Sequence, residues 1–198
     1  MTTVKKATAK KATSTNLITV KNAYIVFHID GGIGKNIAGT AVAAAIKKNY
    51  PDHKLIIVTS WIEPWYNNTN VYRVFHTSQT VYFYQDYIIG KETKVFMLDP
   101  YRTSAFIHKQ KSLIEIWCDL FNIEYDGEQP QLYFNAREHE FVRNQIIQNR
   151  PVFILQTNGG TLNNPNGISW ARDLPLSIAQ EVVNHFAQNH LVLHIKQE

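Results

Sequence analysis

Hydrophobic residues in this sequence gather into short continuous runs, each followed by a polar or glycine-rich segment. The runs at 24–29 and 55–59 are rich in β-branched and aromatic residues, as expected for strands of a parallel sheet covered on both faces. Residues 37–49, between them, are alanine-rich and end in Lys47 and Lys48, which places cations at the negative end of a helix. The pattern predicts a βαβ unit with parallel strands and a right-handed crossover.

The middle of the chain has a less regular pattern. Residues 61–70 are predicted to be loop, with short strands at 71–75 and 95–98, and residues 81–84 fit either a strand or the start of a helix. Apolar residues at three- and four-residue spacing predict one long amphipathic helix over 104–122. Shorter elements are expected at 132–134, as a strand, and at 138–148, as a helix.

A second strand–loop–helix pattern begins near residue 150. A buried strand is expected at 151–157, followed by a polar loop, a helix at 176–188 and a strand at 191–195. Two strands alone cannot bury both faces of a sheet. Either this unit joins the first sheet or the chain belongs to a truncated two-domain protein, and the pattern favours truncation. The predicted organisation is a disordered basic tail at 1–16, a Rossmann-like domain at 17–149, and the first βαβ unit of a second domain at 150–198.

Composition narrows the class of protein. At 44% hydrophobic residues, the 198-residue chain can bury a substantial core. No apolar run approaches the roughly 20 residues of a membrane helix, and the N-terminus lacks the apolar segment of a secretory signal. The lone cysteine, Cys118, excludes an internal disulfide framework and a multi-cysteine zinc site. These features predict a cytoplasmic protein, with Cys118 as a small core residue.

The net charge of +4 comes from the tail. Lys5, Lys6, Lys10 and Lys11 lie within the first sixteen residues, where there are no acids, and the remainder is neutral. A basic tail adds weak attraction to nucleic acid or anionic lipid. The neutral body gives no reason to expect nucleic acid as a partner.

The segment Asp30-Gly31-Gly32-Ile33-Gly34-Lys35-Asn36 follows the first predicted strand and precedes a helix. Glycines let backbone N–H groups approach a ligand closely, and the helix N-terminus behind them favours an anionic group. A tight turn needed only for packing is the structural alternative. The P-loop pattern, which Gly34-Lys35 suggests, fails twice, because it requires glycine at Ile29 and Ser or Thr at Asn36.

Three segments resemble glycosyltransferase family nine, the lipopolysaccharide heptosyltransferases. The first is residues 24–59 with the glycine loop, and the second is Asn67-Asn68-Thr69-Asn70-Val71-Tyr72-Arg73-Val74. The third has Gly159-Gly160 followed by Trp170-Ala171-Arg172-Asp173-Leu174-Pro175. The resemblance implies a glycosyltransferase B fold, in which the first Rossmann-like domain binds the acceptor and the second binds the nucleotide-sugar donor.

The resemblance also implies a set of site residues. Acceptor-binding residues would be Gly31, Gly32, Gly34 and Asn36, and donor-binding residues would be Asn158, Gly159, Gly160, Thr161 and Arg172. The family's acidic residue after the glycine loop, thought to act as general base, aligns with Lys35, and a protonated lysine cannot accept a proton. We therefore expect Asp30 to serve as the base and Lys35 to bind a phosphate or carboxylate of the acceptor. Asp99-Pro100-Tyr101-Arg102, after another predicted strand, either lines the acceptor cleft or is ordinary loop.

The predicted function is transfer of a sugar from a nucleotide-diphosphate sugar to a glycan or lipid-linked acceptor. No cofactor and no metal are expected, since enzymes of this class generally work without a bound metal. The expected partners are the donor and the acceptor, with peripheral membrane contact left open. A degenerate P-loop NTPase and a non-catalytic module that binds a sugar or nucleotide are the alternatives.

Overall fold

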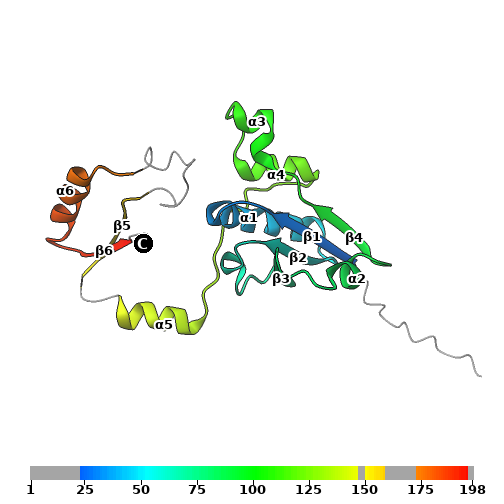
Figure 1. The fold of residues 1–198 in the computed structure, drawn as a ribbon, viewed down its shortest axis with the longest axis horizontal. Coiled ribbons are helices and arrows are strands. Elements are labelled where there is room, and N and C mark those ends of the chain that lie inside the picture. The colour runs from blue at the N-terminus through cyan, green and yellow to red at the C-terminus, as the bar shows by residue number, and fades with distance from the viewer. Residues whose placement is uncertain (1–22, 147–149, 159–172, 196–198) are drawn as a thin grey trace, which may run out of the picture. The chain divides into compact units, whose positions relative to one another are not determined.

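The computed structural model describes residues 23–146, 150–158 and 173–195. The chain divides into two compact units, one ending at Tyr133 and the other beginning at Phe134. Figure 1 labels the helices and strands of both units. The predicted tail at 1–16 lies outside the described residues.

The first unit is built on a four-stranded parallel sheet in the order β3-β2-β1-β4 (Figure 1). Its strands are β1 (Ala23–Ile29), β2 (Lys54–Thr59), β3 (Arg73–His76) and β4 (Glu92–Phe96). Phe27 on β1 is in register with Ile57 on β2 and with Phe96 on β4. The parallel pairing of β1 with β2 around helix α1 (Ile33–Asn49) confirms the predicted βαβ unit and the α/β class.

Different helices pack on the two faces of this sheet. One face packs against α1 and α4 (Leu113–Phe121), and side chains alternate along each strand, so every second residue of β1 and β2 points there. The opposite face packs against the short helix α2 (Phe83–Tyr87). The buried apolar core of the α1 and α4 face is Ile25, Phe27, Ile29, Val42, Ala43, Ala45, Ile46, Leu55, Ile57, Trp65, Trp117, Cys118, Phe121 and Ile123.

Small residues allow α1 to lie close to the sheet. A Cβ added at Gly39 would come within 2.8 Å of Ile29 Cδ1 and 3.4 Å of the Trp65 ring. Phe27, beneath α1, packs edge-on against Trp65, Trp117 and Phe121 with ring centroids 5.3–6.5 Å apart. The alanine-rich composition of this helix therefore reflects tight packing on β1.

The single long helix predicted at 104–122 is wrong, because the structure has two. Helix α3 (Ser104–Ile107) ends before Lys109, which adopts a left-handed conformation with φ of 53°. Helix α4 then begins at Leu113. Its N-cap residue, Ser112, forms a capping box with Glu115. The apolar spacing was periodic, but the new cap at Ser112 competed with helix continuation.

The structure also shows the secondary structure of the segments between these elements. The ambiguous stretch at 81–84 contributes to α2, and the loop at 61–70 contains a short 3₁₀ helix, η1 (Glu63–Trp65). A second 3₁₀ helix, η2 (Pro100–Arg102), follows β4. The predicted strand at 132–134 is wrong, since those residues are not part of any strand. No helix in the described parts of the chain is long and apolar enough to cross a bilayer.

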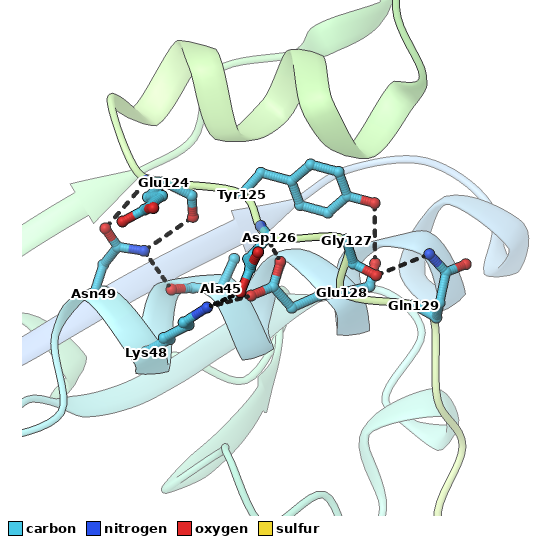
Figure 2. A network of polar contacts seen from close by, with 9 residues as sticks. All are labelled: Ala45, Lys48, Asn49, Glu124, Tyr125, Asp126, Gly127, Glu128 and Gln129. Atoms are coloured by element: carbon cyan, nitrogen blue, oxygen red, sulfur yellow. Dashed lines mark hydrogen bonds and ion pairs between the residues drawn. The ribbon is translucent and has the colours of Figure 1, made fainter.

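The chain leaving α4 is fastened to the C-terminal end of α1 (Figure 2). We call residues 123–129 the return segment. The Asn49 side chain donates to the Glu124 carbonyl (3.0 Å) and accepts from the Glu124 N–H (3.1 Å). Lys48 forms an ion pair with Asp126 at 2.6 Å and lies 3.9 Å from Glu128. These contacts hold the return segment against the helix end.

The second unit contains α5 (Ala136–Gln145), β5 (Val152–Gln156), α6 (Leu176–Phe186) and β6 (Leu191–Ile195). Strands β5 and β6 pair in parallel as a separate two-stranded sheet, so they do not extend the first sheet. The Phe153 ring stacks on Phe186 with centroids 3.9 Å apart. Ala179 is the only buried residue that the structure describes in this unit, and the other apolar side chains described there are half-buried or exposed.

Candidate functional site

The glycine loop connects the end of β1 to the start of α1. Gly31 has φ of +106°, a conformation that L side chains rarely adopt, and a Cβ there would lie 3.1 Å from Lys35 Cδ. Gly32 is the N-cap residue of α1. A Cβ at Gly32 or Gly34 would meet nothing within 4 Å. The loop therefore needs glycine at Gly31 for its backbone and leaves open space beside Gly32 and Gly34.

Lys35 lies in the first turn of α1, and its ammonium group is committed to Asp99. Lys35 Nζ donates to Asp99 Oδ1 at 3.0 Å, although only 8% of the lysine side chain is exposed. The same ammonium lies 5.1 Å from the ring centroid of Tyr101 and 5.5 Å from that of Trp117, within the range of cation–π attraction. A buried charge requires partners of this kind.

Asp99 follows β4 and is 38% exposed. Partial desolvation acts to raise the pKa of Asp99, but the hydrogen bonds from Lys35 and from the Tyr101 N–H, with the charges of Lys35 and Arg102, outweigh it. The net result is a pKa below the ordinary value. Asp99 is therefore ionised throughout the neutral pH range.

Asn36, predicted to bind the acceptor, is fully buried. Its Oδ1 accepts hydrogen bonds from Thr59 Oγ1 (2.6 Å) and Trp65 Nε1 (3.1 Å), and its Nδ2 donates to the Gly32 carbonyl (3.2 Å). The side chain thus joins the first turn of α1 to the end of β2 and to η1. A ligand could reach it only by breaking those bonds.

A crevice of about 450 Å³ opens where β1 and β4 end. We call it the β1/β4 crevice, and its lining residues are Asp30, Met97, Leu98, Asp99, Arg102, Thr103 and Leu120. Asp30 is 76% exposed, and its Oδ1 lies 3.4 Å from His28 Nε2. The structure thus brings Asp30 and Asp99 to one crevice, while Lys35 lies against Asp99 and does not line it.

The position of this crevice follows from the strand order. The chain proceeds from β1 outward to β2 and β3, and then returns to place β4 on the other side of β1. In open α/β sheets, such a reversal leaves a gap at the carboxyl ends of the two strands on either side of it, here β1 and β4, and ligands bind in gaps of this kind. The β1/β4 crevice lies at that point of the first unit.

The second unit has its own cavity beside the ends of β5 and β6. It has a volume of about 630 Å³, and Thr157, Asn158 and His194 are among its lining residues. Thr157 Oγ1 lies 2.9 Å from His194 Nε2 and donates to Asn158 Oδ1 at 3.1 Å. Asn158 is thus the predicted donor-binding residue that the structure places in a cavity. The other four, Gly159, Gly160, Thr161 and Arg172, lie outside the described residues.

Several polar residues of these cavities were missed or left open by the sequence. For Asp99 and Arg102, the sequence did not decide between a role in the acceptor cleft and an ordinary loop. Thr103 and His194 gave no signal beyond their place near the ends of strands. Each lies at or after the carboxyl end of a parallel strand, which is the signal that could have found them. In the described ranges, no three His, Cys, Asp or Glu side chains gather as a candidate metal site.

A Rossmann-like parallel sheet followed by a second parallel βαβ unit defines an α/β fold of the glycosyltransferase B kind. Two solved structures share it. The glycosyltransferase family 9 protein from Veillonella parvula matches with a TM-score of 0.60 at 13% identity, over 91% of this chain and 64% of that one. ADP-heptose lipopolysaccharide heptosyltransferase II from Escherichia coli matches with a TM-score of 0.57 at 12% identity, over 86% of this chain and 63% of that one.

This likeness is one of fold, and it confirms the fold expected from the resemblance to family nine. The chain spans less than two thirds of the length of either solved structure. No protein-family model matches it, and no curated protein matches it significantly.

Proposed function

We propose that this chain is a glycosyltransferase-like protein that transfers a sugar from a nucleotide-diphosphate sugar to the hydroxyl group of a glycan or lipid-linked acceptor. The observation that carries the proposal is the β1/β4 crevice. It is a crevice whose lining includes two carboxylates, at the ligand-binding edge of a fold shared with glycosyltransferases.

In this proposal the first unit binds the acceptor and the second binds the donor. Asp30, exposed at the crevice, removes the proton from the acceptor hydroxyl. The hydroxyl oxygen then bonds to the anomeric carbon of the donor sugar, and the bond from that carbon to the diphosphate breaks. The leaving diphosphate requires positive charge or N–H donors, and the donor-side residues predicted from the sequence would supply them, beginning at Asn158.

The geometry supports this function over a P-loop NTPase. A P-loop lysine must reach the β- and γ-phosphates of the nucleotide, whereas Lys35 is bound to Asp99 and largely buried. The hydroxyl side chain that holds Mg²⁺ in a P-loop is replaced by Asn36, which is itself buried and hydrogen-bonded.

One observation favours a second candidate, a binding module without turnover. The family's catalytic acid aligns with Lys35, and here that side chain is tied up in an ion pair. If Asp30 does not act as the base, the crevice can still bind a sugar without transferring one.

Ligand panels separate these functions. The 198-residue protein is mixed with nucleotide-diphosphate sugars and, separately, with ATP and Mg²⁺. Melting temperature reports binding, because a ligand that binds only the folded state stabilises it by about 2.7 kcal/mol at 100 times its Kd. Release of nucleoside diphosphate in the presence of a mixed glycan acceptor pool reports transfer.

We expect a nucleotide sugar to raise the melting temperature and ATP to leave it unchanged. Stabilisation by ATP alone would contradict the proposal. Binding of a nucleotide sugar without any release of the diphosphate would select the binding module if a longer chain that includes a full second domain is equally inactive.

A further inference from the structure

The lining of the β1/β4 crevice has a net negative charge, although a lysine lies close by in the first turn of α1. Its walls carry the carboxylates of Asp30 and Asp99 and one guanidinium, that of Arg102. Lys35 balances Asp99 from outside the lining. An incoming phosphate would therefore meet two carboxylates, and the charge of the one cation in the lining, Arg102, already acts on Asp99.

Lys35 is withdrawn from ligand binding by its own contacts. Its ammonium donates to Asp99 Oδ1 and lies beside the rings of Tyr101 and Trp117. To bind a phosphate, it would have to leave all three and abandon a partly desolvated carboxylate.

Asp99, by contrast, keeps one oxygen available. Lys35 Nζ and the Tyr101 N–H both donate to Oδ1. No other described residue donates to either oxygen of this carboxylate, so Oδ2 has no donor among the described residues, and Asp99 lines the crevice. A carboxylate oxygen is an acceptor only, and the donors that suit it are hydroxyl or N–H groups.

We propose that the β1/β4 crevice binds an uncharged, hydroxyl-bearing sugar group, with Asp99 Oδ2 and Asp30 accepting hydrogen bonds from its hydroxyls, and that it excludes phosphate. The inference rests on the proposed function and names the class of acceptor. It also replaces the expectation that Lys35 binds an anionic group of the acceptor.

The remaining lining suits such a ligand. Met97, Leu98 and Leu120 give the crevice an apolar part, and a pyranose ring has C–H faces that pack on apolar side chains while its hydroxyls point to polar ones. Lys35 acts here as a positioning residue, because it holds one oxygen of Asp99 and leaves the other for the sugar.

The test uses the 198-residue protein labelled with ¹⁵N. Its amide resonances are followed by NMR during titration with methyl glycosides of neutral hexoses and heptoses, and separately with inorganic phosphate. In the unmodified protein we expect a glycoside to shift the amides of Gly31, Asp99 and Tyr101, and phosphate to leave them in place.

Two variants sharpen the test. Asp99→Asn removes the acceptor charge and frees Lys35, so we expect glycoside affinity to fall at least tenfold and phosphate to begin shifting the same amides. Asp30→Asn, at an exposed position, should also weaken glycoside binding but should not create phosphate binding. If Asp99→Asn does not fold, the unmodified protein and Asp30→Asn still test whether the crevice binds a glycoside and excludes phosphate.

Shifts of these amides by phosphate in the unmodified protein would overturn the proposal, and so would the absence of shifts with every glycoside. The result is independent of the donor assay. Glycoside binding without nucleotide-sugar binding would contradict the proposed function and support this inference. Nucleotide-sugar binding without glycoside binding would support the proposed function and contradict this inference.

Discussion

The Lys35–Asp99 ion pair makes stability depend on a single carboxylate. Asp99→Asn leaves the ammonium of Lys35 buried beside a neutral amide. We expect the free energy of unfolding in urea at pH 7 to fall by about 1–3 kcal/mol, below the loss for a fully buried pair because Asp99 is partly exposed. The double variant Lys35→Met with Asp99→Asn should recover part of the loss, because no charge then remains unpaired. A neutral effect of Asp99→Asn would contradict the importance of the pair.

The same pair predicts a pH dependence. The pKa of Asp99 is lower in the folded protein than its unfolded value of about 3.9. Its contribution to stability is therefore complete above about pH 4 and is lost as the pH falls through the folded pKa. Urea unfolding at pH 7 and pH 3 should show the difference between the unmodified protein and Asp99→Asn shrinking at the lower pH. A difference that grows on acidification would reverse the expected sign.

Asp30 permits a test of chemistry that hardly involves folding. Its carboxylate is 76% exposed, so Asp30→Asn should leave the melting temperature within about 1 °C, as is usual for surface substitutions. If Asp30 is the general base, turnover should fall by a factor of about 10²–10⁴ while donor affinity is unchanged. Diphosphate release and nucleotide-sugar titration measure the two quantities. Full activity in this variant would remove Asp30 from the mechanism.

At the level of single residues, the sequence could predict where the loop lies but not which side chains pair. Gly31 and Lys35 were identifiable because they fall between a buried strand and a helix. The partner of Lys35 is 64 positions away, and only the return of the chain to β4 brings it close. The partners of Asn36 could not be predicted for a related reason, since Thr59 and Trp65 come from other elements.

Helix α1 contains two glycines that should respond oppositely to alanine. Gly39→Ala places a methyl group against Ile29 and Trp65, and we expect a loss of about 1–3 kcal/mol through overpacking. Gly34→Ala is the matched control, because its methyl group meets nothing within 4 Å. It should be neutral or stabilising by up to about 1 kcal/mol through helix propensity. Equal effects on the urea midpoint would mean that α1 does not pack closely on β1.

The end of α1 offers another contrast, between two neighbouring side chains. Asn49→Ala removes both hydrogen bonds to the Glu124 backbone, and we expect it to cost about 1–2 kcal/mol. Lys48→Ala breaks an exposed ion pair with Asp126, so its effect should be smaller and should vanish in 1 M salt. Thermal unfolding at low and high salt distinguishes the two. A larger effect at Lys48 would show that charge, rather than backbone pairing, holds the return segment.

Elements with one dominant signal were predictable from the sequence. The runs that form β1, β2, β5 and β6 are continuous and apolar, and each is a strand. The pattern failed where a local cap outweighed periodicity, as at Ser112, and where a strand-like run had no neighbour to pair with, as at 132–134. Strand pairing and capping depend on geometry that hydrophobic spacing does not encode.

The two units differ in how much apolar surface they bury, and their stability should differ accordingly. The described core is almost entirely in the first unit, while Ile154, Leu176 and Ile195 of the second are exposed. Hydrogen exchange followed by mass spectrometry should therefore show slow exchange in β1 and β2 and much faster exchange in β5 and β6. Equal protection of the two sheets would show that the second unit has stabilising contacts beyond those described.

The Lys35–Asp99 pair also limits how this protein can evolve. The resemblance to family nine implies an acidic residue at position 35, and Lys35→Asp is one change that would introduce it. In this protein, however, it would direct a second carboxylate toward Asp99 within a largely buried first turn. Changing Asp99 first would instead leave the buried ammonium of Lys35 without its carboxylate partner. The two positions are therefore mutationally coupled, and we expect either single change to give a less stable protein than the present pair.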